Sequence, residues 1–268
     1  MMSSRVEADE EYYNRIKKFN IVHYAGETPY YSVAPLRPAE KALLGTLPQG
    51  SSILDLGCGS GRFSVGAALL GFKVTGLDIT AAAIEAARAK ALRENAQNAV
   101  FVEGDMTSLP FPDGSFDYVF CPRFVINAVA TFRKREKAVA EMLRVVNPSG
   151  TVFIESFNEL YCGRGPGTPL VNIIKGIWRR VVIALHAWTG KPYTGLLPGD
   201  IVYKNNKVEG APDGYAHLPT IIELRRMLPE EKRSTAIFRS IPQITGRIKG
   251  MDIFKYFRYS MWVIVKKR

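Results

Sequence analysis

One short stretch of the chain combines an acid with a run of glycines. Asp55 precedes Gly57, Gly59 and Gly61, which stand at every second position. Glycine allows a left-handed backbone and leaves no Cβ between the main chain and a ligand. The spacing is not the G-x-G-x-x-G of dinucleotide-binding turns, because Arg62 stands where the third glycine would fall. The simplest alternative is an ordinary turn between a strand and a helix that binds nothing.

The acid in this turn indicates the kind of ligand. A carboxylate at Asp55 would repel a pyrophosphate, whereas it could accept hydrogen bonds from an ammonium group. We therefore expect a ligand that carries an amino acid zwitterion as well as a nucleoside. The helix expected after Gly61 adds unpaired N–H groups and a partial positive charge for something anionic.

Two further acids follow the next two predicted strands. Asp78 lies about 20 residues beyond the glycines, where an acid accepts hydrogen bonds from the two hydroxyls of a ribose. Ile79 would then pack against an adenine. We expect Asp105 to accept a hydrogen bond from the adenine amino group, and Met106 to offer its backbone N–H and its side chain to the ring. An acid at Asp78 would bind the ribose of a nicotinamide dinucleotide as well as that of another nucleoside cofactor, so it does not distinguish between them.

An α/β fold is needed to bring these residues together. Apolar strands and helical patterns alternate along the chain, which is typical of a Rossmann-like fold. The expected strands span residues 53–56, 72–77, 100–103, 116–121 and 151–155, and the expected helices span 38–47, 63–70, 81–95, 134–145 and 219–228. A short charged helix is expected at 8–19, a loop at 28–32 and a final strand hairpin within 235–268. Tyr12 and Tyr13 on the first helix either reach the ligand or pack.

The motifs resemble those of one enzyme family. Asp-x-Gly-x-Gly-x-Gly after an apolar strand is similar to motif I of the class I S-adenosylmethionine-dependent methyltransferases. Gly104-Asp105-Met106, followed by Leu-Pro-Phe-Pro-Asp-Gly-Ser-Phe-Asp at 109–117, resembles the methyltransferase type 11 group, which includes the ubiquinone and menaquinone methyltransferases. The resemblance covers roughly residues 50–157.

The resemblance implies a fold and an activity. It implies a seven-stranded sheet, parallel except for an antiparallel last strand, and methyl transfer from S-adenosylmethionine, with S-adenosylhomocysteine as the product. The cofactor would lie at the carboxyl edge of the strands, where the resemblance also places Cys58 in the glycine turn and Cys121 at the end of the fourth strand.

Two residues are candidates for a catalytic role. Arg123 follows the fourth strand in Cys-Pro-Arg-Phe, where it could hold an anionic substrate or pair with a nearby acid. This segment only partly matches the [DNS]-P-P-[YF] signature of nucleic-acid amino methyltransferases, which argues against that reaction. His217 lies in a segment that resembles one just before the last strands of many type 11 relatives, and this resemblance makes it the best candidate for a general base; a structural histidine is its alternative. No metal is expected, since no His, Asp and Glu cluster has metal-ligand spacing.

The excess of positive charge lies in one part of the chain. The net charge of the 268 residues is +11, but residues 1–160 hold 17 Lys and Arg against 18 Asp and Glu, whereas residues 161–268 hold 19 against 7. This asymmetry suggests an anionic partner: RNA, an acidic membrane surface or an anionic substrate. Solvated surface charge that serves solubility is the alternative.

A long insertion follows the fifth expected strand. We treat residues 1–268 as one domain in which residues 158–218 form a substrate cap or lid. Within it, residues 170–188 form an amphipathic helix with a basic stripe and two tryptophans, Trp178 and Trp188. This helix could close the pocket, lie on an anionic membrane surface, or serve as a dimer contact or core.

Localisation and function follow as expectations. The three cysteines form no C-x-x-C pair and fit a reducing cytosol, and neither a secretory signal nor a membrane span is evident, so we expect a cytoplasmic protein with peripheral membrane contact as an option. The leading hypothesis is methyl transfer to a small-molecule or lipid-like acceptor, an anionic one included. The alternatives are an RNA-modifying methyltransferase, a catalytically silent cofactor-binding scaffold and, more distantly, a nicotinamide oxidoreductase. The oligomeric state is open.

Overall fold

The computed structural model describes most of the chain. It describes residues 2–31, 35–157, 199–203, 214–249 and 260–268, together with separate positions at 174, 177–178, 181–182, 184–185, 188 and 196. Within the first helix, side chains are described for residues 7–25. Most of the expected insertion at 158–218 lies outside the described residues, so its role as a cap stays a prediction.

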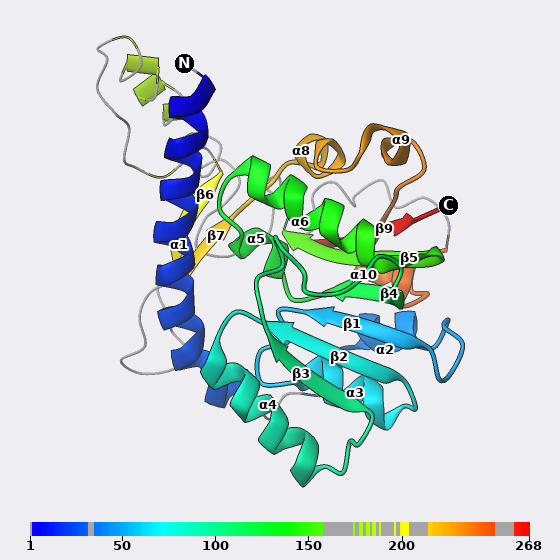
Figure 1. The fold of residues 1–268 in the computed structure, drawn as a ribbon. Coiled ribbons are helices and arrows are strands. Elements are labelled where there is room, and N and C mark those ends of the chain that lie inside the picture. The colour runs from blue at the N-terminus through cyan, green and yellow to red at the C-terminus, as the bar shows by residue number, and fades with distance from the viewer. Residues whose placement is uncertain are drawn as a thin grey trace.

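A seven-stranded sheet forms the centre of the molecule (Figure 1). The order is β3-β2-β1-β4-β5-β9-β8, in which β1 to β5 run parallel and β9 is antiparallel to both of its neighbours. The strands are β1 (Ser52–Leu56), β2 (Lys73–Asp78), β3 (Ala99–Glu103), β4 (Phe116–Cys121), β5 (Val146–Phe157), β8 (Ile237–Ser240) and β9 (Ser260–Lys266). The Rossmann-like architecture with an antiparallel last strand is therefore confirmed.

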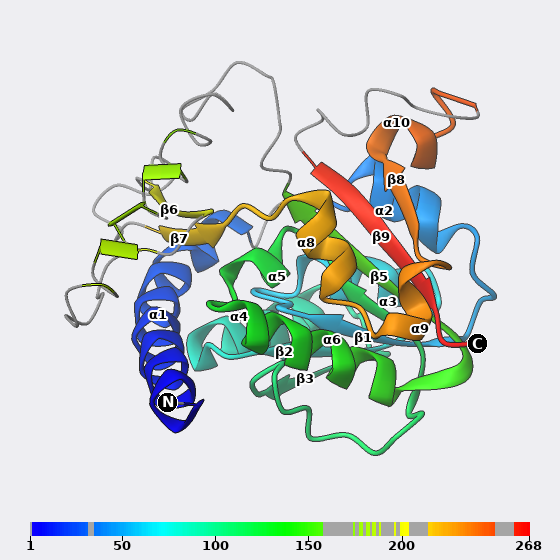
Figure 2. The same ribbon diagram turned by 90° about the horizontal axis from the view of Figure 1, so that it is seen from above.

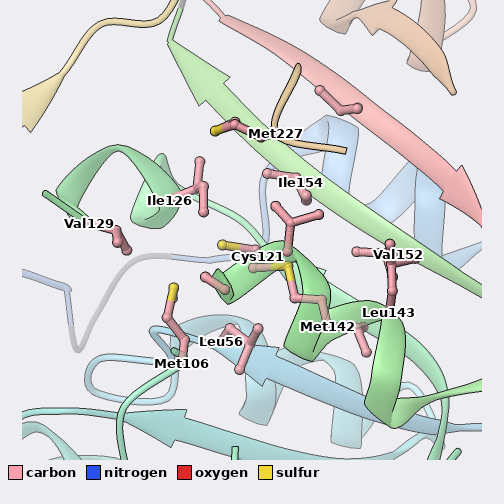
Figure 3. Packing of buried hydrophobic residues seen from close by; sticks show 14 of the residues in the cluster. Leu56, Met106, Cys121, Ile126, Val129, Met142, Leu143, Val152, Ile154 and Met227 are labelled. Atoms are coloured by element: carbon pink, nitrogen blue, oxygen red, sulfur yellow. The ribbon is translucent and has the colours of Figure 1, made fainter. Parts of the chain in front are cut away.

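Helices cover both faces of the sheet and bury two apolar clusters. The first cluster lies against α5 (Val125–Ala128), α6 (Phe132–Val145) and α8 (Ile221–Arg226), and Figure 3 shows part of it. The second lies against α2 (Pro38–Leu44), α3 (Arg62–Leu69) and α4 (Ala81–Arg93). Side chains alternate between the clusters along each strand. On β4, for example, Val119 and Cys121 join the first cluster and Phe120 joins the second. Short helices α9 (Glu230–Arg233) and α10 (Ile241–Ile244) flank β8.

The first helix differs most from expectation. It spans Met2–Tyr31 as α1, whereas the apolar pattern predicts a helix only over 8–19 and a loop over 28–32. Polar contacts hold its second half: the side-chain amide of Asn20 donates to the carbonyl oxygen of Ala128 at 2.8 Å, and His23 is fully buried. Apolar periodicity detects only the part of a helix that packs through apolar side chains, so it predicts a helix that is too short where polar contacts hold the rest.

Three strands also differ from the sequence prediction. No strand is expected between residues 156 and 234, but β6 (Asp200–Tyr203) and β7 (Gly214–His217) form a separate antiparallel pair beside α1 (Figure 2). Strand β5 begins at Val146, five residues earlier than expected. Its pairing with β4 shifts register between Phe116 and Tyr118, which accommodates the Asn-Pro-Ser-Gly segment at residues 147–150.

A ladder of buried charges joins α2 to its neighbours. Glu40, which is fully buried, accepts from both terminal nitrogens of Arg62, at 2.7 and 2.6 Å, and from the backbone N–H of Arg37 at 2.7 Å. Arg37 in turn pairs with Glu155, fully buried on β5. Burial alone would raise the pKa of Glu40, but Arg62 and Arg37 outweigh it and lower the pKa. Such groups are stable inside a protein only while each charge keeps its partner.

The substitution Glu40→Gln tests this ladder. It leaves the nearly buried guanidinium of Arg62 without its anionic partner, so the free energy of unfolding should fall by about 3–5 kcal/mol in urea titrations. The matched control is Glu94→Gln, which removes the more exposed partner of Lys90 at i,i+4 on α4 and should cost about 0.3–0.5 kcal/mol. Equal, small losses for both variants would contradict a structural role for the ladder.

Candidate functional site

A pocket opens at the carboxyl ends of the parallel strands. Its walls come from the glycine turn after β1, the ends of β2 and β3, the segment after β4, and one face of α1. It encloses about 1180 Å³, counting the solvent in its mouth. In open α/β sheets this edge is the usual place for a ligand.

The three glycines of the turn have different roles. All three have positive φ, at 66° for Gly57, 52° for Gly59 and 78° for Gly61. A Cβ on Gly57 would lie 2.4 Å from Cγ1 of Val125, so this glycine permits close packing. A Cβ on Gly59 would meet no atom within 4 Å, and this residue lines the pocket, so Gly59 leaves its main chain open to a ligand.

The structure gives Gly61 a packing role, and its contact with the cofactor stays a prediction. Gly61 caps α3 and does not line the pocket. A Cβ there would lie 3.1 Å from Cβ of Ala87 and 3.2 Å from the ring of Phe101. Gly61 therefore lets α3 pack closely on α4 and β3, a need that spacing alone does not reveal.

Asp55 is the most constrained acid of the pocket. It lines the pocket wall yet is fully buried, and its Oδ2 accepts from the hydroxyl of Ser64 at 2.5 Å. Its Oδ1 has no hydrogen-bond partner among the described residues. Burial raises the pKa of Asp55 to about 7, although Ser64 and Arg62 oppose the shift. A cationic donor beside Oδ1 would satisfy this oxygen and favour the ionised carboxylate.

Asp78 supports the turn and faces the pocket at the same time. Its Oδ2 accepts from the backbone N–H of Gly59 and its Oδ1 from that of Thr80, both at 2.9 Å. Burial raises the pKa of Asp78, and these N–H groups oppose the shift. Each carboxylate oxygen keeps acceptor capacity, so the pair can receive two neighbouring hydroxyls. Ile79 lines the pocket beside it, and its packing against an adenine stays a prediction.

Asp105 is more fully bonded than the sequence suggested. It accepts from the hydroxyl of Tyr13 and the ammonium group of Lys17, both at 2.8 Å, and from the N–H and hydroxyl of Thr107 at 2.9 and 2.8 Å. Burial alone would raise its pKa, but the hydrogen bonds from Lys17 and Thr107 lower it to about 2. Asp105 thus holds α1 over the pocket, while Met106 lines the wall and its contact with an adenine stays a prediction.

The covering face of α1 was largely missed from the sequence. Tyr13, Lys17, Asn20 and Tyr24 all line the pocket and stand at i, i+4, i+7 and i+11. This spacing places them on one face of a helix. The signal is present in the sequence, but it is a polar and aromatic stripe, so a search for apolar periodicity finds only part of it.

The segment after β4 has an unusual backbone. Arg123 and Phe124 have φ values of 57° and 64°, a left-handed conformation that is costly for non-glycine residues. Two contacts hold it: the backbone N–H of Arg123 donates to Oε2 of Glu155 at 2.7 Å, and the Phe124 ring stacks on Phe157 with centroids 3.8 Å apart. Arg123 lines the pocket, so the structure links it to an acid through its main chain and leaves a substrate role as a prediction.

The two predicted cysteines are placed differently. Cys58 lines the pocket from the glycine turn. Cys121 does not line the pocket: it is fully buried and belongs to the first apolar cluster (Figure 3), so its contact with the cofactor stays a prediction. Burial raises the pKa of both thiols, which makes them poor nucleophiles.

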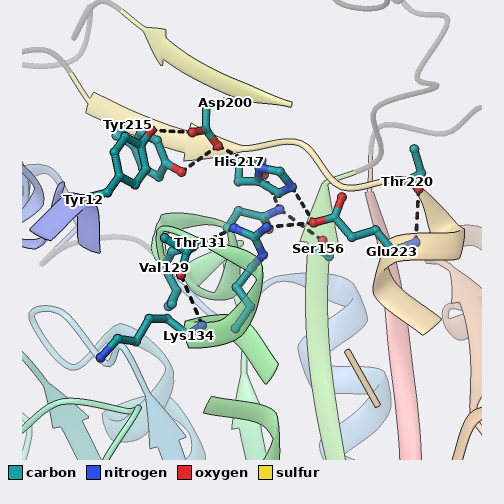
Figure 4. A network of polar contacts seen from close by, with 12 residues as sticks. Tyr12, Val129, Thr131, Lys134, Ser156, Asp200, Tyr215, His217, Thr220 and Glu223 are labelled. Atoms are coloured by element: carbon teal, nitrogen blue, oxygen red, sulfur yellow. Dashed lines mark hydrogen bonds and ion pairs between the residues drawn. The ribbon is translucent and has the colours of Figure 1, made fainter. Parts of the chain in front are cut away.

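His217 is placed away from the pocket lining, within a polar network (Figure 4). Its Nδ1 lies 2.8 Å from Asp200 and its Nε2 lies 2.8 Å from Glu223, while Asp200 also accepts from Tyr12 and Tyr215. Both ring nitrogens are therefore occupied by carboxylates. The structure thus gives this histidine a structural role between β7 and α8, and its role as a general base stays a prediction.

The site shows nothing that would bind a metal in the described part of the chain. No group of three or more His, Cys, Asp and Glu side chains there could hold an ion. Among the described helices, none is long and apolar enough to cross a membrane. The open main chain at Gly59, the unpaired Oδ1 of Asp55 and the hydroxyl acceptors of Asp78 fit a nucleoside that carries an ammonium group.

Comparison with known proteins identifies the same region. Residues 53–150 match a family described as methyltransferase domain. A 2-methyl-6-phytyl-1,4-hydroquinone methyltransferase from Synechocystis is 39% identical over 119 residues, which cover 43% of this chain and 35% of that protein. A demethylmenaquinone methyltransferase from Renibacterium salmoninarum is 32% identical over 115 residues, which cover 43% of this chain and 44% of that protein. The chain thus spans less than half the length of either relative.

Solved structures share the fold over most of the chain. A SAM-dependent methyltransferase from Methanosarcina mazei has a TM-score of 0.56 at 23% identity and covers 87% of this chain and 97% of its own. The CcbJ methyltransferase from Streptomyces caelestis has a TM-score of 0.60 at 15% identity and covers 92% of this chain and 99% of its own. At these identities the likeness shows the fold.

The buried acid gives a test that needs no ligand. Because the folded pKa of Asp55 is about 7 and the unfolded value is about 3.9, the folded state holds this proton more tightly. The group's contribution to stability is full below about pH 4 and is lost as the pH rises to about 7. The free energy of unfolding of the unmodified protein should therefore fall relative to Asp55→Asn across this window, by on the order of 3 kcal/mol.

Urea titrations at several pH values measure this difference. Asp113→Asn is the control, because the side chain of Asp113 is 81% exposed and its difference from the unmodified protein should stay nearly constant. Parallel pH profiles for the unmodified protein and Asp55→Asn would show that Asp55 does not hold its proton as the buried geometry requires.

Proposed function

We infer the function from one premise: this chain belongs to the class I S-adenosylmethionine-dependent methyltransferases, of the type 11 group, with its methyltransferase domain at residues 53–150. We propose that the protein binds S-adenosylmethionine in the pocket and transfers its methyl group to a small-molecule or lipid-like acceptor. The observation that carries the proposal is the unpaired, buried Oδ1 of Asp55 beside the open main chain of Gly59.

The pocket residues divide the recognition of the cofactor among them. Asp55 would accept from the amino group of the methionine part, and Asp78 from the two ribose hydroxyls. Ile79 and Met106 would lie against the adenine, both from the pocket wall. Asp105 is already bonded to α1, so its contribution is to keep Tyr13 and Lys17 over the ligand.

The protein's part in the reaction is mainly placement. When bound, the cofactor supplies a methyl group already activated on a sulfonium, so the acceptor must be aligned and water excluded. The α1 face and the α5 region line the pocket and would exclude water from the bound cofactor. No histidine of the described chain lines the pocket. We therefore expect an acceptor that is nucleophilic by itself or sufficiently acidic to lose its proton without a histidine base.

The wall after β4 favours an apolar acceptor. Pro122, Val125, Ala128 and Val129 line this side, and Arg123 is the charged residue among them. An apolar body with one anionic or polar group would match this wall. The two quinol-related relatives carry hydroquinone or menaquinone acceptors in their names, which supports a lipid-like acceptor with an aromatic head.

RNA is the second candidate acceptor. The observation that favours it is the charge of residues 161–268, which hold 19 Lys and Arg against 7 Asp and Glu. Binding driven by that charge would weaken steeply with salt.

Labelled methyl transfer tests the proposal. Purified protein with radiolabelled S-adenosylmethionine is incubated with lipid, small-molecule and RNA fractions of the source cell, and label is expected in the lipid or small-molecule fraction.

The substitution Asp78→Asn removes half of the ribose acceptor. S-adenosylhomocysteine should therefore bind about ten- to hundredfold more weakly in calorimetry, and methyl transfer should fall by a similar factor.

The exposed Asp113→Asn is the matched control and should bind and react as the unmodified protein does. Label confined to RNA would replace the lipid-like acceptor with the second candidate. Cofactor binding without transfer to any fraction would contradict the enzymatic proposal and favour a silent scaffold.

A further inference from the structure

Six exposed apolar side chains form a ridge within the insertion. They are Ile174, Ile177, Trp178, Val181, Leu185 and Trp188, which we call the apolar ridge; each is helical and between 45% and 85% exposed. Their spacing of i, i+3, i+4, i+7, i+11 and i+14 places them on one face of a helix. In both views these helical pieces lie beyond the β6–β7 pair, away from the main sheet (Figures 1 and 2).

The ridge differs from the other exposed apolar residues of the described chain. Leu92 on α4, Val100 on β3 and Ile222 on α8 are exposed singly on different elements, which is normal for a protein surface. Six apolar side chains on one face, two of them tryptophan, are the kind of surface that marks an interaction site. A face that closed on the pocket would be buried against it, so the exposure also argues against a lid contact through this face.

The charge of the surrounding sequence indicates the partner. Residues 160–199 contain five Lys and Arg and no Asp or Glu. A helix with an exposed apolar face, tryptophans on that face and a wholly basic sequence context matches an anionic lipid surface, where the apolar face enters the headgroup boundary and basic side chains meet lipid phosphates. A protein partner or a second copy of this chain would not require the absence of acids over forty residues.

We propose that the apolar ridge docks the protein on an anionic membrane surface. Trp178 and Trp188 lie at the water–lipid boundary, and the ridge residues between them enter the outer acyl region. The inference does not depend on methyl transfer, and its test uses neither cofactor nor acceptor. Its failure would leave the proposed function untouched, and failure of methyl transfer would leave the docking surface in place.

Vesicle binding followed by tryptophan fluorescence tests the docking surface. The protein has three tryptophans, and the third, Trp262, is fully buried, so a change on adding vesicles reports on the ridge. Vesicles of phosphatidylcholine with about 30 mol% phosphatidylglycerol should shift the emission to shorter wavelength and co-sediment the protein, and added salt should weaken both effects. Brominated lipids should quench the emission of the unmodified protein.

Two variants distinguish binding through the apolar ridge from non-specific binding through any exposed apolar side chain. The double variant Trp178→Ala, Trp188→Ala should lower binding to anionic vesicles by more than about tenfold, whereas Leu92→Ala, an equally exposed apolar change on α4, should bind as the unmodified protein does. The quenching experiment needs no variant, so it decides the question even if the double variant fails to fold.

Several results would overturn the proposal. Absence of vesicle binding or of quenching by brominated lipids would do so, as would binding that the double variant retains. A different result would assign the ridge to another partner. The unmodified protein would bind no vesicles but would bind RNA or form a concentration-dependent dimer, and the double variant would lose that RNA binding or that dimer.

Discussion

A single carboxyl group, that of Asp55, sets the chemistry of the pocket. It is fully buried at the end of β1, and only one of its oxygens has a partner, the hydroxyl of Ser64. Burial, together with the nearby Glu40 and Asp78, keeps its pKa near 7, while Ser64 and Arg62 work in the other direction. The group is therefore poised between its neutral and charged forms, and a cation at the unpaired oxygen would decide between them.

The surrounding structure keeps this group in place. Backbone hydrogen bonds fix the turn after β1. The N–H groups of Gly57 and Cys58 donate to the carbonyl oxygen of Leu77, and the N–H of Gly59 donates to the carboxylate of Asp78. Arg62 at the start of α3 begins the ladder of buried charges: it pairs with Glu40, Glu40 contacts Arg37, and Arg37 pairs with Glu155. Glu155 also fixes the left-handed segment after β4, so one chain of charges connects two walls of the pocket.

The cover of the pocket is tied to two separate acids. Asp105 at the end of β3 binds Tyr13 and Lys17, and Asp200 on β6 accepts from Tyr12. Helix α1 therefore rests on the main sheet and on the small β6–β7 pair together. Any movement that opened the pocket by lifting α1 would have to break charge-assisted hydrogen bonds at both places.

Much of the site could be predicted because its signals are local. Gly57 and Gly59 of the turn, Asp78 with Ile79, and Met106 follow from strand, turn and helix patterns within a few residues, and all of them line the pocket. The structure adds roles that the sequence did not suggest where long-range packing decides. Gly61 lets the backbone pack closely on Ala87 and Phe101, and Cys121 belongs to the core. The ring of His217 contacts the carboxylates of Asp200 and Glu223. Ala87 and Phe101 are distant from Gly61 in sequence, and Asp200 lies in the small sheet, which no local pattern revealed.

The most direct measurement is calorimetry of S-adenosylhomocysteine binding at about pH 7 in two buffers with different enthalpies of ionisation. If the ligand's ammonium group lies beside Asp55, binding ionises that carboxyl and releases up to about half a proton, because its pKa without ligand is about 7. The measured enthalpy should then differ between the buffers, and the difference should vanish in Asp55→Asn. Equal enthalpies in both buffers for the unmodified protein would contradict the assignment of Asp55 as the acceptor of a cation.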